Sequence, residues 1–200
     1  MVNHTNHEAE HAHVHLKIKI AVSGAAETTD CPPGTLEKAK EVGAEIVRQG
    51  AIAVTGATTG APYWAAIGAK EAGGFVFGLS PAATEREHVE HYKLPIDYHD
   101  LIIYTGFGYS GRNLFLTKAG DAVIVVCGRI GTLNEFTDAF EDKKPIGVLI
   151  GTGGTADQIK DIVEKSHRAA DDPYIVYDAD PKELVRKVLV LVEQLRVKDK

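Results

Sequence analysis

The stretch DAVIVV at residues 121–126 constrains the fold more than any other part of the sequence. Its small and β-branched apolar residues form a run too short for a helix and too uniformly apolar for a half-exposed strand, so they predict a central parallel strand buried on both faces. The following residues, CGRIGT at 127–132, contain two glycines and lead into apolar residues at helical spacing. A helix beginning at 130–132, directly after a strand and a glycine turn, predicts a site for an anion.

Other short apolar runs alternate with helical patterns along the chain. This alternation predicts a Rossmann-like α/β fold, with three α/β/α layers and a mainly parallel sheet of about seven strands. The polar stretch at 82–98, with a helical turn near 87–92, predicts either a lid or a surface excursion. We expect strands at residues 16–23, 51–54, 74–79, 100–104, 121–126, 145–150 and 174–177.

The chain divides into a short tail and one domain. With 44% hydrophobic and 25% charged residues in 200, residues 16–200 fit a single Rossmann-like domain. The polar composition of residues 1–15 predicts a mobile tail, which contains histidines at positions 4, 7, 11, 13 and 15. Because no cysteine or paired carboxylate completes a ligand spacing there, we predict no metal site.

Charge and composition limit the classes of partner that we expect this protein to bind. A net charge of −6 and a pI near 5.8 oppose the phosphate backbone of a nucleic acid, so we expect small-molecule partners and no nucleic acid. No apolar stretch approaches the roughly 20 residues of a membrane span, so we expect no membrane partner. Cys31 and Cys127 are the only cysteines. Together these features predict a cytoplasmic protein with free thiols.

The glycines gather in turns that follow predicted strands, which is the edge where ligands bind in open α/β sheets. Arg112 and Glu135 would face the same edge, and either Phe107 or Tyr109 could stack on a base. Loop amides, hydroxyls and arginines favour a phosphate attached to a polyhydroxylated group, which is a nucleotide or ribose phosphate. The residues predicted to bind it are Gly24, Gly56, Gly60, Gly128, Arg129, Gly131 and Thr132.

The stretch CGRIGTLNE at 127–135 resembles the Pro-Gly-Gly-x-Gly-Thr-x-x-Glu motif of the LONELY GUY phosphoribohydrolases, within the superfamily that includes the Smf/DprA proteins. Arg112 precedes Asp121 by nine positions, as that family's catalytic Arg precedes its strand. Looser agreement covers residues 17–150. The resemblance implies a homodimer or higher homo-oligomer in which Arg112 and Glu135 are catalytic, and Gly128, Gly131 and Thr132 hold the phosphate. It also implies hydrolysis of a nucleoside 5′-monophosphate to free base and ribose 5-phosphate. No lysine stands in a setting that would anchor a cofactor, and we expect none.

The sequence departs from that motif at two positions, where Cys127 replaces Pro and Arg129 replaces the second Gly. Arg129 could add a contact to the phosphate or fill the space that the phosphate needs. Two hypotheses therefore stand, a phosphoribohydrolase and a non-catalytic nucleotide-binding or sensing protein. DNA binding is disfavoured because the chain is acidic and lacks a basic stripe. Cys127 lacks a recognisable His partner, which disfavours a role as nucleophile.

Overall fold

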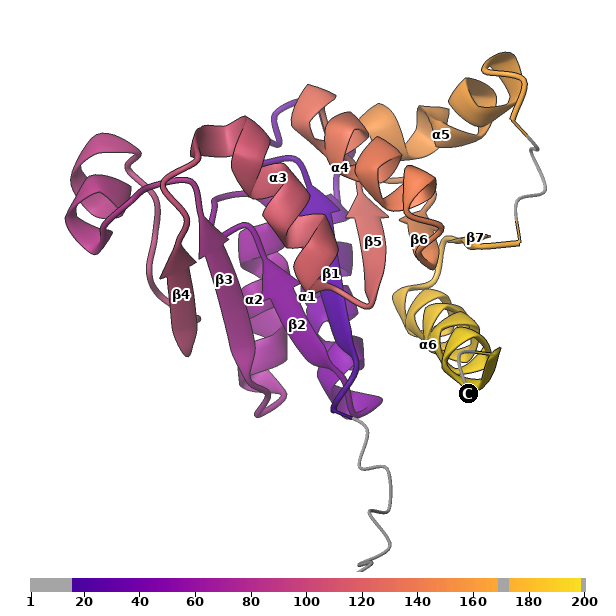
Figure 1. Ribbon diagram of the computed structural model, residues 1–200, viewed down its shortest axis with the longest axis horizontal. Coiled ribbons are helices and arrows are strands. Elements are labelled where there is room, and N and C mark those ends of the chain that lie inside the picture. The colour runs from indigo at the N-terminus through magenta and orange to yellow at the C-terminus, as the bar shows by residue number, and fades with distance from the viewer. Residues whose placement is uncertain (1–15, 169–172, 199–200) are drawn as a thin grey trace, which may run out of the picture.

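The computed structural model describes residues 16–168 and 173–198, and the predicted tail at 1–15 lies outside the described residues. Strands and helices alternate along the described chain (Figure 1). The strands are β1 (Lys19–Gly24), β2 (Ile52–Thr55), β3 (Val76–Ser80), β4 (Leu101–Tyr104), β5 (Ala122–Val126), β6 (Ile146–Leu149) and β7 (Ile175–Asp178). The helices are α1 (Thr35–Arg48), α2 (Ala61–Glu71), η1 (Glu87–His91, a π-helical turn), α3 (Gly108–Ala119), α4 (Ile130–Glu141), α5 (Gly154–Lys165) and α6 (Pro181–Lys198).

The described strands form one parallel sheet in the order β4-β3-β2-β1-β5-β6-β7. The predicted three-layer, Rossmann-like fold with a parallel sheet of about seven strands is therefore confirmed. The chain builds outward from β1 in one direction and from β5 in the other, so the winding reverses between them. In that pair Ser23 lies beside Val125, and Gly24 beside Val126. Such a reversal leaves a crevice at the carboxyl ends of the two central strands.

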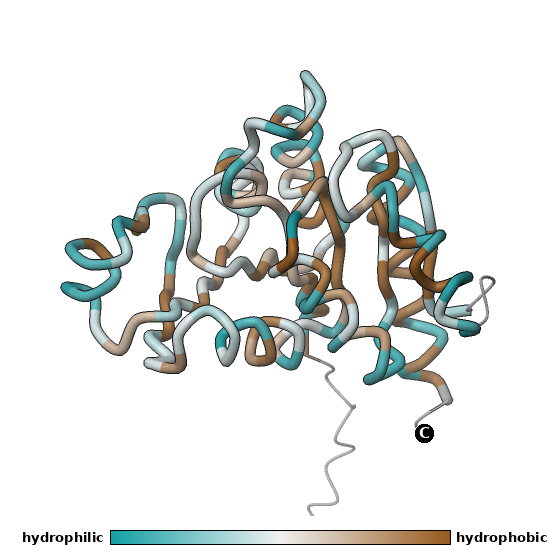
Figure 2. Tube along the Cα trace, turned by 90° about the horizontal axis from the view of Figure 1, so that it is seen from above, coloured by the Kyte–Doolittle hydropathy of each residue, from teal (hydrophilic) through white to brown (hydrophobic). Residues whose placement is uncertain are grey.

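Two apolar cores hold the helices against the sheet. Side chains of α1, α2 and α6 pack on one face, and those of α3, α4 and α5 pack on the other. Every residue of β5 is buried, as the run at 121–126 predicts. Figure 2 shows the hydrophobic positions gathered along the strands between the helical layers.

The sequence predicts helices at residues 64–72 and about 112–119, and both begin earlier in the structure. α2 starts at Ala61 because Pro62 suits the first turn of a helix, where its missing N–H is not needed. α3 starts at Gly108, whose φ of +63° is a conformation that favours glycine, and it continues through Gly111 despite the low helix propensity of that residue. Arg112 consequently lies in the second turn of α3, where it is buried, and does not open the helix.

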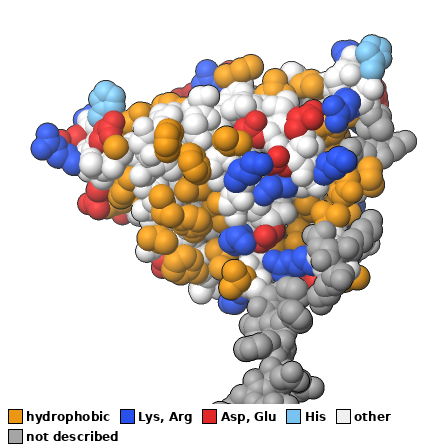
Figure 3. Space-filling model, in the orientation of Figure 1, with side chains coloured by type: hydrophobic (Ala, Val, Ile, Leu, Met, Phe, Trp, Pro, Cys, Tyr) orange, Lys and Arg blue, Asp and Glu red, His pale blue; other side chains and the backbone are white. Residues whose placement is uncertain are grey.

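The edge strand β4 and the helix α3 expose apolar side chains on one face of the molecule. Figure 3 shows these hydrophobic side chains gathered left of centre. They include Leu101 and Ile103 of β4, and Leu114 and Phe115 of α3. Among the described helices, none is long and apolar enough to cross a membrane.

Helices α1 and α2 approach each other through glycines. A Cβ added at Gly43 would lie 1.8 Å from the carbonyl oxygen of Ala65, and one at Gly68 would lie 1.8 Å from that of Lys40. Both contacts are with backbone, which cannot swing aside as a side chain can. Helix propensity alone predicts that Gly43→Ala stabilises the protein by up to about 1 kcal/mol.

We expect the opposite, because the two helices must separate to admit the methyl group. Gly43→Ala should lower the free energy of unfolding by about 1–3 kcal/mol in urea denaturation. The exposed Glu41→Ala on the same helix should change it by less than about 0.5 kcal/mol. Stabilisation by Gly43→Ala would show that the close approach of the helices is unimportant.

Candidate functional site

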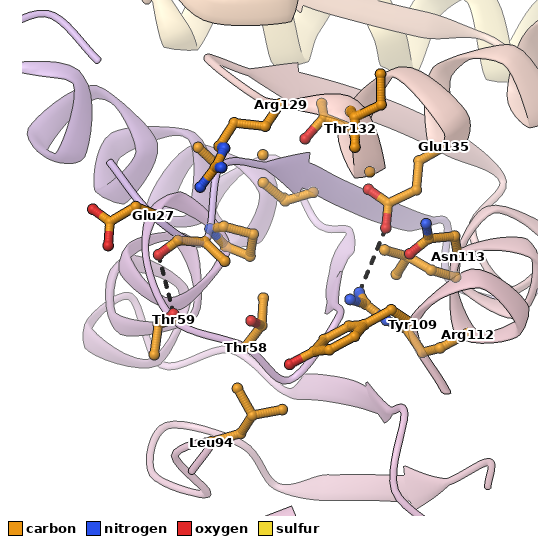
Figure 4. Close-up of a pocket in the computed structure, with 18 of the residues that line it drawn as sticks. Glu27, Thr58, Thr59, Leu94, Tyr109, Arg112, Asn113, Arg129, Thr132 and Glu135 are labelled. Atoms are coloured by element: carbon orange, nitrogen blue, oxygen red, sulfur yellow. Dashed lines mark hydrogen bonds and ion pairs between the residues drawn. The ribbon is translucent and has the colours of Figure 1, made fainter. Parts of the chain in front are cut away.

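A cavity of about 440 Å³ lies at the carboxyl ends of β1 and β5, in the crevice where the winding reverses. The loop after β1, the turn after β2, the helix α3 and the first turn of α4 form its walls (Figure 4). Segments far apart in the sequence therefore meet there. Six of the predicted site residues line it: Gly24, Arg112, Arg129, Gly131, Thr132 and Glu135.

Arg112 and Glu135 form a buried ion pair in the wall of this cavity. Nη1 of Arg112 lies 3.5 Å from Oε1 of Glu135, and the two side chains are 8% and 6% exposed. Figure 4 shows them side by side, with Arg112 coming from α3 and Glu135 from α4. The predicted pair is thus brought together across the interface of these two helices. Such a pair is costly to break, because the remaining charge stays buried without compensation.

Two neutral groups hold the Glu135 carboxylate in place. The hydroxyl of Ser23, the buried penultimate residue of β1, donates a hydrogen bond to Oε2. Turned so that its nitrogen faces the carboxylate, the amide of Asn113 donates to Oε1 at 2.9 Å and to the carbonyl oxygen of Tyr109 at 2.9 Å. Glu135 is therefore fixed by three elements, β1, α3 and its own helix.

Burial sets the ionisation of this pair. Loss of solvation raises the pKa of Glu135, whereas the charge of Arg112 and the hydrogen bond from Ser23 act in the opposite direction. Loss of solvation also lowers the pKa of the Arg112 guanidinium, against the attraction of Glu135. A carboxyl group with a raised pKa beside a buried cation, in the wall of a cavity, is typical of a functional site.

Gly56 makes room for the Arg112 guanidinium. A Cβ at Gly56 would lie 1.6 Å from Nη1 of Arg112, so any side chain there would displace the cation. Gly56 does not line the cavity, and it acts behind the site, where the guanidinium is held. Nε of Arg112 is buried and has no hydrogen-bond partner among the described residues. The cation therefore has donor capacity that its protein neighbours leave unused.

The first turn of α4 forms the other end of the cavity. Gly131 is exposed, and only the Asn113 amide, at 3.9 Å, lies within 4 Å of the place that its Cβ would occupy. Thr132 is buried in the wall, and Arg129 is exposed directly before the helix. The N–H groups of a first helical turn have no partner within the helix, and the helix dipole favours an anion there. This end can hold a phosphate.

Two other predicted glycines shape the loops and do not line the cavity. Gly60 has a φ of +70°, and its missing Cβ would lie 2.1 Å from the carbonyl oxygen of Ala25, so it lets the turn after β2 pack on the loop after β1. Gly128 has a φ of +108° and packs against the side chain of Thr132. Contact of these glycines with a nucleotide stays a prediction.

Aromatic and aliphatic residues form the wall opposite α4. The polar stretch predicted as a lid or excursion contributes Tyr92, Lys93 and Leu94 to the cavity. Tyr92 meets Tyr109 edge to face, with ring centroids 5.4 Å apart. The Arg112 guanidinium carbon lies 5.9 Å from the Tyr109 ring centroid. Of the two residues that could stack on a base, Tyr109 therefore lines the cavity, whereas Phe107 is 65% exposed and stacks on Phe115 outside it.

The prediction of free thiols is wrong, because Cys31 and Cys127 form a disulfide with Cα atoms 6.1 Å apart. Cys31 lies in the loop after β1, and Cys127 follows β5. The two strands are neighbours in the sheet although the cysteines are 96 positions apart in the sequence. The fold thus brings together two thiols that sequence spacing cannot pair. The described residues contain no cluster of three or more His, Cys, Asp or Glu side chains that could hold a metal.

A family model for the SLOG cluster4 family matches residues 17–185. The chain belongs to the SLOG cluster4 family. An uncharacterized protein of Archaeoglobus fulgidus is 31% identical over 132 residues, which cover 66% of this chain and 80% of the relative. The predicted resemblance to the superfamily of LONELY GUY and Smf/DprA proteins is confirmed at the level of that superfamily. Membership of the LONELY GUY branch stays a prediction.

Solved structures share the fold of this SLOG cluster4 chain. The molybdenum cofactor carrier protein of Chlamydomonas reinhardtii is 29% identical, with a TM-score of 0.68, over 91% of this chain and 99% of that one. The molybdenum cofactor binding protein of Rippkaea orientalis is 23% identical, with a TM-score of 0.66, over 90% and 98%. DNA processing protein A of Streptococcus pneumoniae is 16% identical, with a TM-score of 0.59, over 87% and 61%. The last two show the fold alone.

Sequence reasoning missed several residues that line the cavity or support its wall. Ser23 could have been identified from the sequence, since it is a polar residue at the carboxyl end of a predicted strand, directly before Gly24. Asn113 follows the predicted Arg112 and is buried with it. Glu27, by contrast, lies in an irregular loop, and Tyr92 lies on an excursion. No local pattern could have assigned these two to the cavity.

The contact between Gly56 and Arg112 leads to a test of stability. Gly56 does not have the positive φ that would itself disfavour a side chain, so Gly56→Ala should act only by displacing the guanidinium. We expect it to lower the free energy of unfolding by about 2–4 kcal/mol, measured by urea denaturation. In an Arg112→Ala background the same substitution should cost less than about 1 kcal/mol. Equal costs in the two backgrounds would contradict the contact.

Proposed function

We propose that this protein binds a nucleoside 5′-monophosphate in the cavity and hydrolyses its N-glycosidic bond, releasing free base and ribose 5-phosphate. The observation that carries this proposal is the position of Glu135 relative to the anion end of the cavity. Gly131 and Glu135 are four residues apart on α4, so they share one helix face and are about 6 Å apart along the axis. A ribose 5-phosphate can span that length, with its phosphate at the first turn and its ribose beside Glu135.

The charges along the cavity support this orientation. Arg129 and the free N–H groups of α4 favour the phosphate at the helix start. The ribose then lies between α4 and Thr58 and Thr59 of the turn after β2. The base would reach the wall of Tyr92 and Tyr109, where an aromatic ring can stack. Each part of a nucleotide thus meets a surface of suitable chemistry.

Glu135 is suited to the chemical step. Cleavage of an N-glycosidic bond gives the ribose oxocarbenium character, and a nearby carboxylate can stabilise this charge or orient the attacking water. At about 4 Å and an effective dielectric near 20, the attraction is roughly 4 kcal/mol, which is about a thousandfold in rate. Ser23 and Asn113 hold the carboxylate in place, so little reorganisation is needed. Arg112, with its unused Nε donor, would hold the substrate and polarise the leaving base.

A second candidate function is non-catalytic binding of a nucleotide-like ligand, as in a sensor or a carrier. Two observations favour it. Arg129 stands in the anion turn, where its side chain can tighten binding without helping turnover. The chain is also 29% identical to a protein named as a molybdenum cofactor carrier. The candidates differ in whether the bound ligand is consumed.

Assembly into a homodimer or higher homo-oligomer remains part of the proposal. The apolar face formed by Leu101, Ile103, Leu114 and Phe115 offers a surface for a second copy, since contiguous exposed apolar patches commonly mark interfaces. A cofactor is not part of the proposed reaction, because water is the second substrate.

Replacement of Glu135 tests the hydrolase directly. The purified protein is incubated with a panel of nucleoside 5′-monophosphates, and free base and ribose 5-phosphate are measured. We expect Glu135→Gln to lower kcat about a thousandfold for the best substrate, since the charge that stabilises the oxocarbenium ion is lost.

The matched control is Glu141→Gln, which removes an exposed carboxylate at the other end of α4 and should leave kcat unchanged. Melting curves of each variant show whether it is folded. If no nucleotide is cleaved, yet one raises the melting temperature of the wild type, the hydrolase is overturned and the binding protein stands.

The raised pKa of Glu135 predicts the pH at which activity falls on the acidic side of the pH–activity profile. The carboxylate must be ionised to stabilise a positive charge, so activity should fall as the pH falls through the pKa of Glu135. Since burial raises that pKa, the midpoint of the fall should lie above 4.5, the ordinary value for a glutamate. Ser23→Ala removes a hydrogen bond to the carboxylate and should move the midpoint higher still. A midpoint of kcat/KM at or below 4.5 would contradict this assignment.

A further inference from the structure

The disulfide links two neighbouring segments, whose exposed residues Glu27 and Arg129 form what we call the mouth of the cavity. Cys31 lies four residues after Glu27, and Cys127 lies two residues before Arg129. Both Glu27 and Arg129 line the cavity (Figure 4). The bond therefore ties the loop carrying the acidic group to the turn carrying the basic group. The attraction of Arg129 contributes to lowering the pKa of Glu27, after the hydrogen bonds from Thr29 and Thr28.

The two linked segments differ in how the rest of the chain holds them. The N–H of Cys127 donates to Oγ1 of Thr152 at 2.8 Å, and its carbonyl accepts from the N–H of Ala156 at 2.8 Å. The N–H of Thr155 donates to the carbonyl of Gly128 at 3.0 Å. The turn at 127–129 is thus docked on the start of α5 and keeps these bonds without the disulfide.

In the described part of the chain, the loop at 27–33 has no comparable hydrogen bonds to other elements, and its packed contact there is that of Pro32 with Gly153, directly before α5. Its hydrogen bonds join Thr29 to Glu27, Cys31 to Thr28 and Pro32 to Thr35, so among the described residues they stay within the loop or reach only the start of α1. Residues 25 and 26 are held separately, by Ala61 and Thr59 of the turn after β2. Beyond residue 26, the disulfide is the one covalent link between this loop and the turn after β5.

We propose that Cys31 and Cys127 form a redox site, at which a small dithiol or a dithiol protein reduces the disulfide, releases the loop at 27–33 and thereby opens the mouth of the cavity. A thiolate of the reductant attacks the Cys31 sulfur, forms a mixed disulfide and releases Cys127 as a thiolate. The second thiol of the reductant then displaces Cys31. Two electrons pass from the reductant, and both cysteines end as thiols after taking up protons.

The surroundings of the two sulfurs support this order of attack. Cys31 is half-buried, whereas Cys127 is 2% exposed, so an incoming thiolate reaches Cys31 first. A Cβ at Gly154, the first residue of α5, would lie 3.2 Å from Sγ of Cys127. The positive end of this helix dipole favours a thiolate at Cys127 and makes it a better leaving group.

Release of the loop affects the ligand in a defined way. Glu27 moves away from Arg129, while the turn at 127–129, which leads into α4, remains docked on α5. The oxidised form thus has a preorganised mouth, and the reduced form must order the loop again when it encloses a ligand. This consequence for the ligand rests on the proposed nucleotide site, whereas the release of the loop does not.

Hydrogen exchange measured by mass spectrometry tests the proposal without a ligand. The full chain is compared before and after treatment with dithiothreitol, and the thiol content of each sample is counted. We expect faster exchange in residues 27–34 after reduction, with residues 127–132 unchanged as an internal control. Cys31→Ser should exchange like the reduced wild type, with or without dithiothreitol.

Three outcomes would overturn the proposal. These are two free thiols in protein kept under oxidising conditions, equal exchange at 27–34 in the two forms, and faster exchange across the whole chain after reduction. The last would mean that the bond stabilises the fold generally. If Cys31→Ser fails to fold, the reduced wild type decides alone.

Adenosine 5′-monophosphate and inorganic phosphate serve as probes of the ligand effect. We expect the affinity for a probe to be about fivefold lower or more after reduction. By linkage, the bound probe must then protect the disulfide against reduction by the same factor. If neither probe binds in either form, the proposed function fails, and the exchange data still decide the redox site.

Discussion

The parallel pairing of β1 with β5 is the constraint on which the site depends. It places the carboxyl ends of two strands, about 100 residues apart in the chain, next to each other. Ser23 arrives from β1, and the turn carrying Arg129 arrives from β5. Helix α4 follows that turn at once, so its first turn and Glu135 lie over the end of β1. Any shift in this register would move Ser23 away from Glu135 and separate the anion end from the carboxylate.

The buried pair of Arg112 and Glu135 carries an unfavourable desolvation free energy. Taking a guanidinium and a carboxylate out of water disfavours both, and the pair alone seldom repays that cost. Here Ser23 and Asn113 add hydrogen bonds to the carboxylate, and Gly56 leaves space for the cation. Even so, Nε of Arg112 lacks a partner. A structure optimised for stability alone would satisfy that donor, so the arrangement makes better sense with a ligand in the cavity.

The structural features that depend on local sequence patterns could be predicted from the sequence. The uniform run at 121–126 identified the central strand, and the glycine turn after it identified the start of α4, because both signals are contained in a few residues. Arg112 and Glu135 were predicted as a pair from a motif and a spacing, and the fold brings them together. The start of α3 was placed too late, since Gly108 and Gly111 have low helix propensity, and Gly108 enters the helix with a φ of +63° that no local pattern indicates. The disulfide was missed because its partners meet only through the strand order.

The cavity divides into a deep part and a mouth that are built differently. The deep part, around Glu135, depends on close packing behind the cavity wall, as at Gly56, where no side chain fits without displacing the Arg112 guanidinium. The mouth is formed by exposed side chains on irregular segments, namely Glu27 and Arg129, whose replacement disturbs no packed backbone. Substitutions that suit a different ligand therefore cost little stability at the mouth and much stability in the deep part. For this reason the choice between turnover and binding concerns Arg129 and its loop, whereas the geometry around Glu135 can serve either.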